Sequence, residues 1–99
     1  MPAYTLAVRV ICAVLNLLAN ATTLVKTGEG VLVSITINTK GATGNTLKIY
    51  DGLTASGTLL ATIDTTASIG TLTFNAKFST GLCIVIATGT AADVTVSYV

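Results

Sequence analysis

Residues 31–38 read Val31-Leu32-Val33-Ser34-Ile35-Thr36-Ile37-Asn38, a run in which apolar and polar side chains largely alternate. Successive side chains of a β-strand point to opposite faces of a sheet, so an alternation with a period of two predicts a half-buried strand. Four apolar residues at every second position are expected to share the buried face: Val31, Val33, Ile35 and Ile37.

The chain on either side of this run repeats the same kind of signal. Short apolar or alternating stretches, rich in Val, Ile and Thr, are separated by clusters of Gly, Asn, Asp and Ser. We expect strands at 21–27, 46–50, 58–64, 72–77, 82–87 and 93–98. Residues 82–87 are almost entirely apolar, which indicates a central strand buried on both faces. The pattern predicts an all-β fold, a single antiparallel β-sandwich of about seven or eight strands that is jelly-roll-like.

Few residues of this chain carry a charge. Charged residues make up 9% of its 99 residues and the net charge is +1, whereas about a quarter of the residues of an average domain are charged. The near-neutral balance argues against a nucleic-acid partner, which calls for a basic patch. The chain has no His, so the commonest general base and metal ligand is missing. The apolar surface of such a small domain must be covered by a membrane or by other protein subunits.

The N-terminal segment is the only candidate for a membrane contact. Arg9 and Asn16 interrupt the apolar run at residues 4–19, and a spanning helix needs about 20 predominantly apolar residues. A signal peptide would carry its positive charge before the apolar run, not inside it. We therefore expect no membrane partner, and burial against protein instead.

Two conformations are open for residues 4–18. A helix would gather the polar residues into a narrow stripe, and the Leu- and Ala-rich part at 13–19 allows a helical turn. The β-branched residues around Arg9 favour a strand, which is the interpretation we adopt. We divide the chain into an N-terminal arm or edge strand at residues 1–20 and a β-sandwich domain at residues 21–99.

Two cysteines, Cys12 and Cys83, lie far apart in the sequence. A disulfide between them is one possibility. We favour two reduced, buried cysteines that act as small hydrophobic residues, which suits assembly in a reducing cytoplasm.

No motif predicts a catalytic, cofactor or metal site. The loop from Asp51 to Gly57 offers one carboxylate and two hydroxyls, but a calcium ion takes six to eight oxygen ligands. An Asp side chain that bonds to loop backbone is the simpler interpretation. Asp51 and Asp64 could form an acid–base pair, but no supporting His, Glu or Trp residues cluster near them in the sequence.

The stretch from about residue 24 to residue 99 resembles a group of small virion proteins of tailed bacteriophages. The resemblance rests on six segments: Val25-Lys26-Thr27-Gly28, Gly30-Val31-Leu32, Leu47-Lys48-Ile49-Tyr50-Asp51-Gly52, Ile63-Asp64-Thr65-Thr66, Phe78-Ser79-Thr80-Gly81-Leu82 and Ala92-Asp93-Val94-Thr95-Val96-Ser97-Tyr98. It implies a β-sandwich subunit of the phage particle, such as a capsid cement or decoration protein. It supplies no catalytic residue, and the first 20 residues match least.

This resemblance sets the functional expectation. The implied function is a structural virion protein on the capsid surface, assembled in the host cytoplasm, with the major capsid protein as its partner and a homo-oligomer (trimer or dimer) as its state. The arm is expected to reach a neighbour by strand addition, through interface residues Tyr4, Leu6, Val8, Val10, Leu15 and Leu17. The alternatives are another virion component (a fibre, tail or head–tail protein), a carbohydrate- or receptor-binding module, and a small membrane-associated protein.

Overall fold

The computed structural model describes residues 12–99, which fold into eight strands without any helix. The strands are β1 (Ala13–Leu17), β2 (Ala21–Thr27), β3 (Gly30–Thr39), β4 (Thr46–Asp51), β5 (Thr58–Asp64), β6 (Gly70–Phe78), β7 (Gly81–Ala87) and β8 (Asp93–Tyr98). The predicted strands at 21–27, 58–64 and 93–98 have these very limits, and the others differ by one or two residues at an end.

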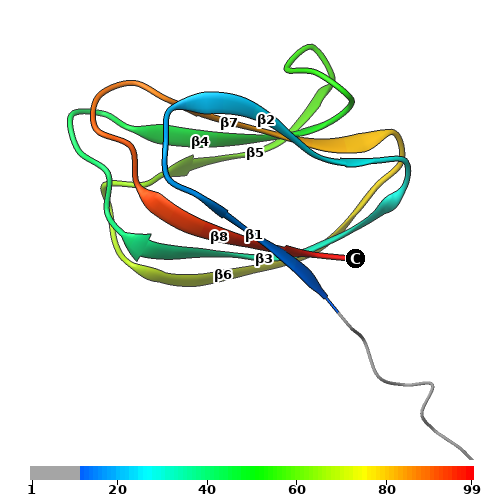
Figure 1. Cartoon of the computed structure of the whole chain (residues 1–99), viewed down its shortest axis with the longest axis horizontal. Coiled ribbons are helices and arrows are strands. Elements are labelled where there is room, and N and C mark those ends of the chain that lie inside the picture. Colours follow the sequence, from blue (N-terminus) through cyan, green and yellow to red (C-terminus); the bar gives the residue numbers. More distant parts are fainter. Residues whose placement is uncertain (1–11) are drawn as a thin grey trace, which may run out of the picture.

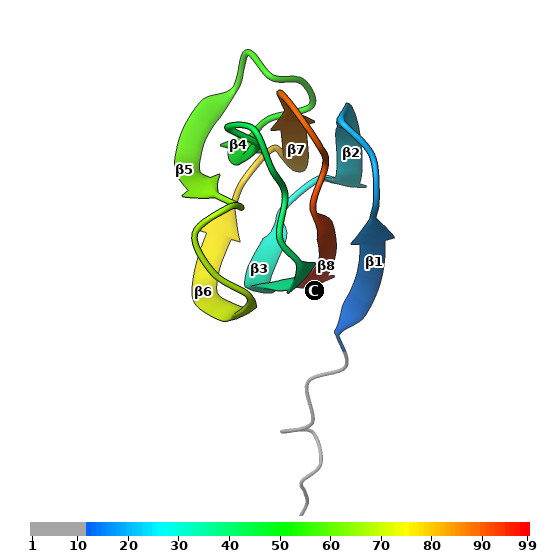
Figure 2. The same cartoon turned by 90° about the vertical axis from the view of Figure 1, so that its left-hand side faces the viewer.

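The strands form two four-stranded antiparallel sheets that pack face to face (Figures 1 and 2). One sheet has the order β1-β8-β3-β6 and the other has the order β2-β7-β4-β5. Only β4 and β5 are consecutive strands within one sheet, so every other connection crosses from one sheet to the other. This interleaved order of eight strands is the jelly roll, and the predicted fold class is confirmed.

The hydrophobic core lies between the two sheets. Each sheet contributes rows of inward-facing side chains that run across its strands, such as Leu15, Val96, Ile35 and Leu72 in the first sheet. The second sheet contributes rows such as Thr23, Ile84, Ile49 and Ala61. Burial of such apolar rows stabilises the sandwich by about 25 cal/mol for each Å² removed from water.

The prediction of a central strand at residues 82–87 is confirmed. β7 lies between β2 and β4, and Leu82, Ile84 and Ile86 point into the core. Cys83 alternates with these residues and so lies on the outer side of the sheet, yet it is completely buried. An almost unbroken apolar run is the expected sequence for such a position.

The alternation predicted for residues 31–38 is wrong at its start. Leu32 is completely buried together with Ile35 and Ile37, whereas Val31 and Val33 are only half-buried. The register of β3 against β8 shifts between Leu32 and Ser34, so one extra residue is inserted on β3. A β-bulge of this kind reverses the phase of the inward and outward positions.

Part of the N-terminal segment is visible as β1. Residues 13–17 form a strand rather than the helical turn that their Leu and Ala content allowed, and they pair with β8 at the edge of the chain's own sheet. The part of the predicted arm that remains for a neighbour is residues 2–11, which lie outside the described residues.

Candidate interaction surfaces

The residues predicted for the interface fall into two groups. Tyr4, Leu6, Val8 and Val10 lie outside the part of the chain that the structure describes. Leu15 and Leu17 lie on the inner side of β1, where both are half-buried and Leu17 packs against the core. The side chains that β1 turns outward are instead Val14 and Asn16, and Val14 is 65% exposed.

The outer face of the β1-β8-β3-β6 sheet is built from hydroxyl and amide groups. Its rows follow directly from the strand register: one row holds Asn16, Thr95, Thr36 and Thr71, and the next holds Val14, Ser97, Ser34 and Thr73. The hydroxyls of Thr36 and Thr71 share a hydrogen bond of 3.0 Å across β3 and β6. Such cross-strand pairs stabilise a sheet modestly.

This face carries an acidic residue, Asp93, as well as the basic residue Lys77 on β6, and the Asp93 carboxylate is held by the protein's own amides. Asn16 and Asn38, one from each strand beside β8, both donate to Asp93 Oδ1 at 2.7 and 3.2 Å. Asn38 also donates to the hydroxyl of Thr95 at 3.0 Å. The face is therefore polar but presents little net charge to a partner.

The outer face of the other sheet carries an apolar row that crosses all four strands. The register aligns Leu24, Cys83, Tyr50 and Leu59. Leu24 is 45% exposed and Leu59 is 49% exposed, while Cys83 between them is covered completely. Burial raises the pKa of the Cys83 thiol. We call this set the Leu24–Leu59 row.

The expectation of two buried cysteines is half right. Both cysteines are free, but only Cys83 is buried, and Cys12 is exposed just before β1. The two cysteines differ in position, because Cys12 precedes the edge strand β1 whereas Cys83 lies in the central strand β7.

A groove opens at the edge of the sandwich between β5 and β6. Its volume is about 380 Å³, and its lining combines the aliphatic side chains of Ile37, Ile63, Ile69 and Leu72 with the polar residues Asp64, Ser68 and Thr71. Ile63 and Ile37 are almost fully buried at its floor, whereas Ile69 is 63% exposed at its rim. The groove is lined mainly by aliphatic side chains.

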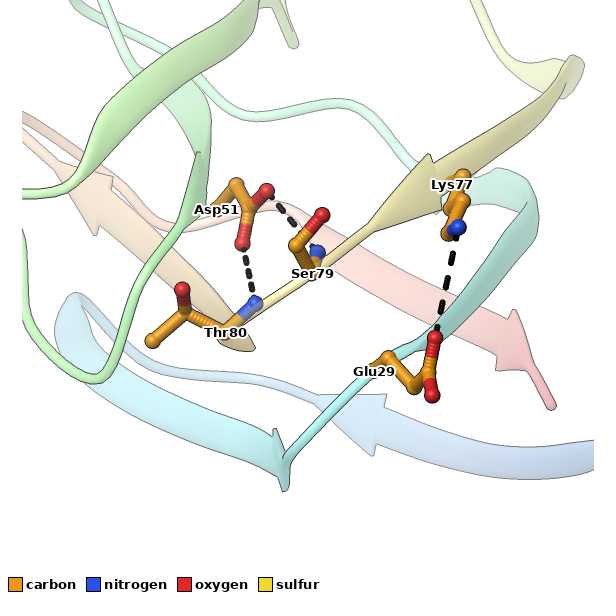
Figure 3. A network of polar contacts seen from close by, with 5 residues as sticks. All are labelled: Glu29, Asp51, Lys77, Ser79 and Thr80. Atoms are coloured by element: carbon orange, nitrogen blue, oxygen red, sulfur yellow. Dashed lines mark hydrogen bonds and ion pairs between the residues drawn. The ribbon is translucent and has the colours of Figure 1, made fainter.

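Asp51 ties two loops together at one end of the sandwich (Figure 3). Its carboxylate accepts hydrogen bonds from the amides of Ser79 at 2.9 Å and Thr80 at 2.8 Å, both in the β6–β7 turn. These bonds, that from Thr80 first, hold the pKa of Asp51 below its usual value. The carboxylate thus bonds to loop backbone as expected, but to the backbone of a different loop.

The described residues offer no other chemistry at the two Asp positions. Asp51 and Asp64 lie at opposite ends of the β4–β5 pair, so they form no acid–base couple. Within residues 12–99 no group of three or more His, Cys, Asp or Glu could hold a metal ion. Over the same residues, no helix has the length and apolar character needed to cross a membrane.

Every carboxylate among the described residues has a partner inside the chain. Asp64 accepts from the hydroxyl and the amide of Thr66, which lowers its pKa. Glu29 lies 4.0 Å from Lys77 in an exposed ion pair (Figure 3). With Asp51 and Asp93 also bonded, the molecule presents hydroxyls, amides and aliphatic groups more than charges.

Sequence reasoning missed both apolar features of the surface, the Leu24–Leu59 row and the groove. Each joins residues that only the strand register brings side by side. The single local signal is the Leu59-Leu60 pair, in which one leucine must face outward on an edge strand. Comparisons of the chain with protein-family models, curated proteins and solved structures found no match.

Proposed function

We propose that this protein is a structural subunit of a bacteriophage particle, a capsid cement or decoration protein that associates with itself and binds the major capsid shell. The phage assignment comes from the resemblance of residues 24–99. The observation that carries the structural role is a jelly roll whose faces are nearly free of unpaired carboxylates and whose outer surface holds an apolar row.

The distribution of charge supports a surface that other proteins cover. Interfaces are depleted of charged residues at their centres and enriched in aromatic residues. Here the carboxylates are turned to the chain's own donors, and the Leu24–Leu59 row contributes Tyr50 and two exposed leucines. The proposed contact with the shell is this row, and repetition over a symmetric lattice multiplies a weak single contact.

The test is the position of the chain on purified particles. Immunogold labelling and cryo-electron microscopy of the particles are expected to place it on the head, in an ordered array over the shell. Label on the tail or fibre would overturn the cement role in favour of another virion component, and absence from washed particles would overturn the virion role.

A binding experiment tests the mechanism separately. Purified protein added to particles stripped of it is expected to sediment with them to a fixed stoichiometry and to raise their resistance to heat. Free protein that stays in the supernatant at all concentrations would contradict the proposal.

A further inference from the structure

The groove between β5 and β6 exists because one inward row lacks its last side chain. Leu17, Val94 and Ile37 face inward in register across β1, β8 and β3, and the row ends on β6 at Gly70. A methyl group added at Gly70 would find no atom within 4 Å. The end of the row is therefore open space above the aliphatic floor of the groove.

The backbone beside this groove is an unprotected strand edge. Among the described strands β6 pairs only with β3, and residues 70–73 are all exposed. The other half of β6 is interrupted at Asn75, which has a φ of 48°, and carries Lys77. Bulges and lysines are the usual means of blocking strand addition. The half of β6 next to the groove has neither.

The N-terminal segment of the chain has the sequence that such an edge accepts. Residues 2–11 alternate, with Tyr4, Leu6, Val8 and Val10 at every second position. Strand addition gives affinity through main-chain hydrogen bonds and specificity through pockets for alternate side chains. Residues 4–10 extend about 23 Å as a strand, which is enough to pair with the open half of β6.

The arm and the groove lie at diagonally opposite corners of one sheet. β1 begins in the row that holds Ala13, Tyr98, Leu32 and Ala76, whereas the groove lies in the row that ends at Gly70. In Figure 1 the β5–β6 connection is at the left, and β1 begins at the lower right. To reach its own groove the arm would have to reverse direction and cross the sheet. A neighbouring copy presents the groove without that reversal.

We propose that residues 2–11 of one copy add as a strand to β6 of a second copy, with their alternate apolar side chains seated in the groove at Ile37, Ile63, Ile69 and Leu72. The two partner surfaces differ, so the contact is heterologous and builds a closed ring or an open chain. This inference deepens the proposed function, because it rests on the self-association included there and names its contact, but it does not depend on the capsid.

Two complementary variants test the exchange. One lacks residues 2–11 and keeps the groove. The other, Ile69→Glu, keeps the arm and places a carboxylate at the rim. Mass photometry of the full chain is expected to show a discrete oligomer or a concentration-dependent series. Each variant alone should associate more than about tenfold more weakly. The deletion removes the added strand, and the new carboxylate of Ile69→Glu would lose hydration when an apolar arm covers the rim.

Mixing the two variants is the decisive step. The intact groove of the first can receive the intact arm of the second, so a one-to-one complex is expected. Leu53→Glu is the matched control, because Leu53 is a similarly exposed aliphatic residue that does not line the groove. It should associate like the original chain, and circular dichroism should show unchanged β-structure in all of these proteins.

Several results would overturn the exchange. They are a full chain that remains monomeric, an Ile69→Glu variant that associates like the original, and a mixture that forms no complex. If the arm deletion fails to fold, a synthetic peptide of residues 2–11 replaces it, and it must bind the original chain but not Ile69→Glu. Particle binding is measured on its own, so assembly without binding to particles would defeat the proposed function while this contact stands.

Discussion

The hydroxyl of Thr65 donates a 2.6 Å hydrogen bond to the side-chain oxygen of Asn45, and both residues are completely buried. The Asn45 amide nitrogen donates in turn to the carbonyls of Ala87 and Thr88 at 3.1 and 2.8 Å. Its side-chain oxygen also accepts from the amide of Ala92 at 3.3 Å. A single buried side chain thus joins three connections at one end of the sandwich, those after β3, β5 and β7.

Removal of the Thr65 hydroxyl should destabilise the fold. Thr65→Val keeps the shape of the side chain but takes one donor from the buried Asn45 oxygen, so the free energy of unfolding is expected to fall by about 1–2 kcal/mol. Thr36→Val is the control. It removes one hydroxyl of the exposed Thr36–Thr71 hydrogen bond and should change stability by less than about 0.5 kcal/mol. Urea denaturation of both variants measures the difference, and equal losses would contradict this role of Thr65.

Gly41 is expected to tolerate no side chain, since the Asn45–Thr65 pair fills the space beside it. A methyl group at Gly41 would lie 2.5 Å from Thr65 Oγ1 and 2.6 Å from Asn45 Oδ1. Gly41→Ala should therefore lower stability by roughly 1–3 kcal/mol through overpacking. In the same turn Gly44 has a φ of 76° and no atom closer than 3.9 Å to such a methyl, so Gly44→Ala measures backbone strain alone.

A double variant separates overpacking against Thr65 from backbone strain in the turn. In Thr65→Val the contacting oxygen is replaced by a methyl group that cannot bond to Asn45, so Gly41→Ala should cost a different amount there than in the original chain, while Gly44→Ala should cost the same in both. Additive losses for Gly41→Ala and Thr65→Val would contradict the proposed contact.

The strands could be predicted from the sequence because their signals are local. Residues 58–64 and 93–98 alternate between flanking turn residues, and nothing beyond the strand itself is needed to place their ends. The apolar run at β7 likewise predicted a central strand, because a strand that is covered on both faces needs no polar positions.

What could not be predicted depends on pairing between distant strands. The bulge in β3 that buries Leu32 is defined against β8, more than sixty residues away in the sequence. The groove at Gly70 and the Leu24–Leu59 row are products of register in the same sense. Asn45 follows Gly44, and this Gly-Asn pair is typical of an exposed turn. In the structure its side chain is buried and bonds to residues far away in the sequence, Asn20 and Thr88.

Acid should destabilise the protein through Asp51 and Asp64. Hydrogen bonds lower the pKa of both carboxyls in the folded state, for Asp51 chiefly the bond from the Thr80 amide and for Asp64 chiefly that from the Thr66 hydroxyl. A group with a lowered folded pKa stabilises above its unfolded pKa and loses this contribution as pH falls through the folded value. The unfolding temperature should therefore drop as pH is lowered below about 4.

Asp51→Asn measures the part of this effect that comes from Asp51. The side-chain oxygen of the new amide can still accept one hydrogen bond from the β6–β7 turn. The NH2 group that replaces the second oxygen is itself a donor, so it cannot accept the bond from the other backbone amide. The variant should be less stable at neutral pH and show a smaller loss between neutral and acid pH. Lys48→Gln, an exposed change in the same strand, serves as the control, and an unchanged pH profile in Asp51→Asn would contradict the role of the carboxylate.

The two cysteines should react with thiol reagents at very different rates. Cys12 is exposed and Cys83 is completely buried, with a thiol pKa raised by burial. Since the thiolate is the reactive form, native protein should consume one equivalent of a disulfide reagent rapidly and the second only on unfolding. Cys12→Ser should abolish the fast phase, and a fast phase that persists in this variant would contradict the burial of Cys83.

The Leu24–Leu59 row should be needed for binding to the capsid shell but not for the stability of the fold. Leu24 and Leu59 are about half exposed at the two edges of one sheet, so Leu24→Glu and Leu59→Glu should each leave the unfolding temperature within a few degrees of the original, since surface changes usually cost less than about 0.5 kcal/mol. Each should weaken co-sedimentation with stripped particles by about tenfold or more, because a charge must then be desolvated at an apolar contact. Ser97→Glu, on the outer face of the opposite sheet and away from the β6 edge, should bind as the original does. If Ser97→Glu weakens binding and the two leucine variants do not, the contact with the shell belongs to the hydroxyl-rich face instead.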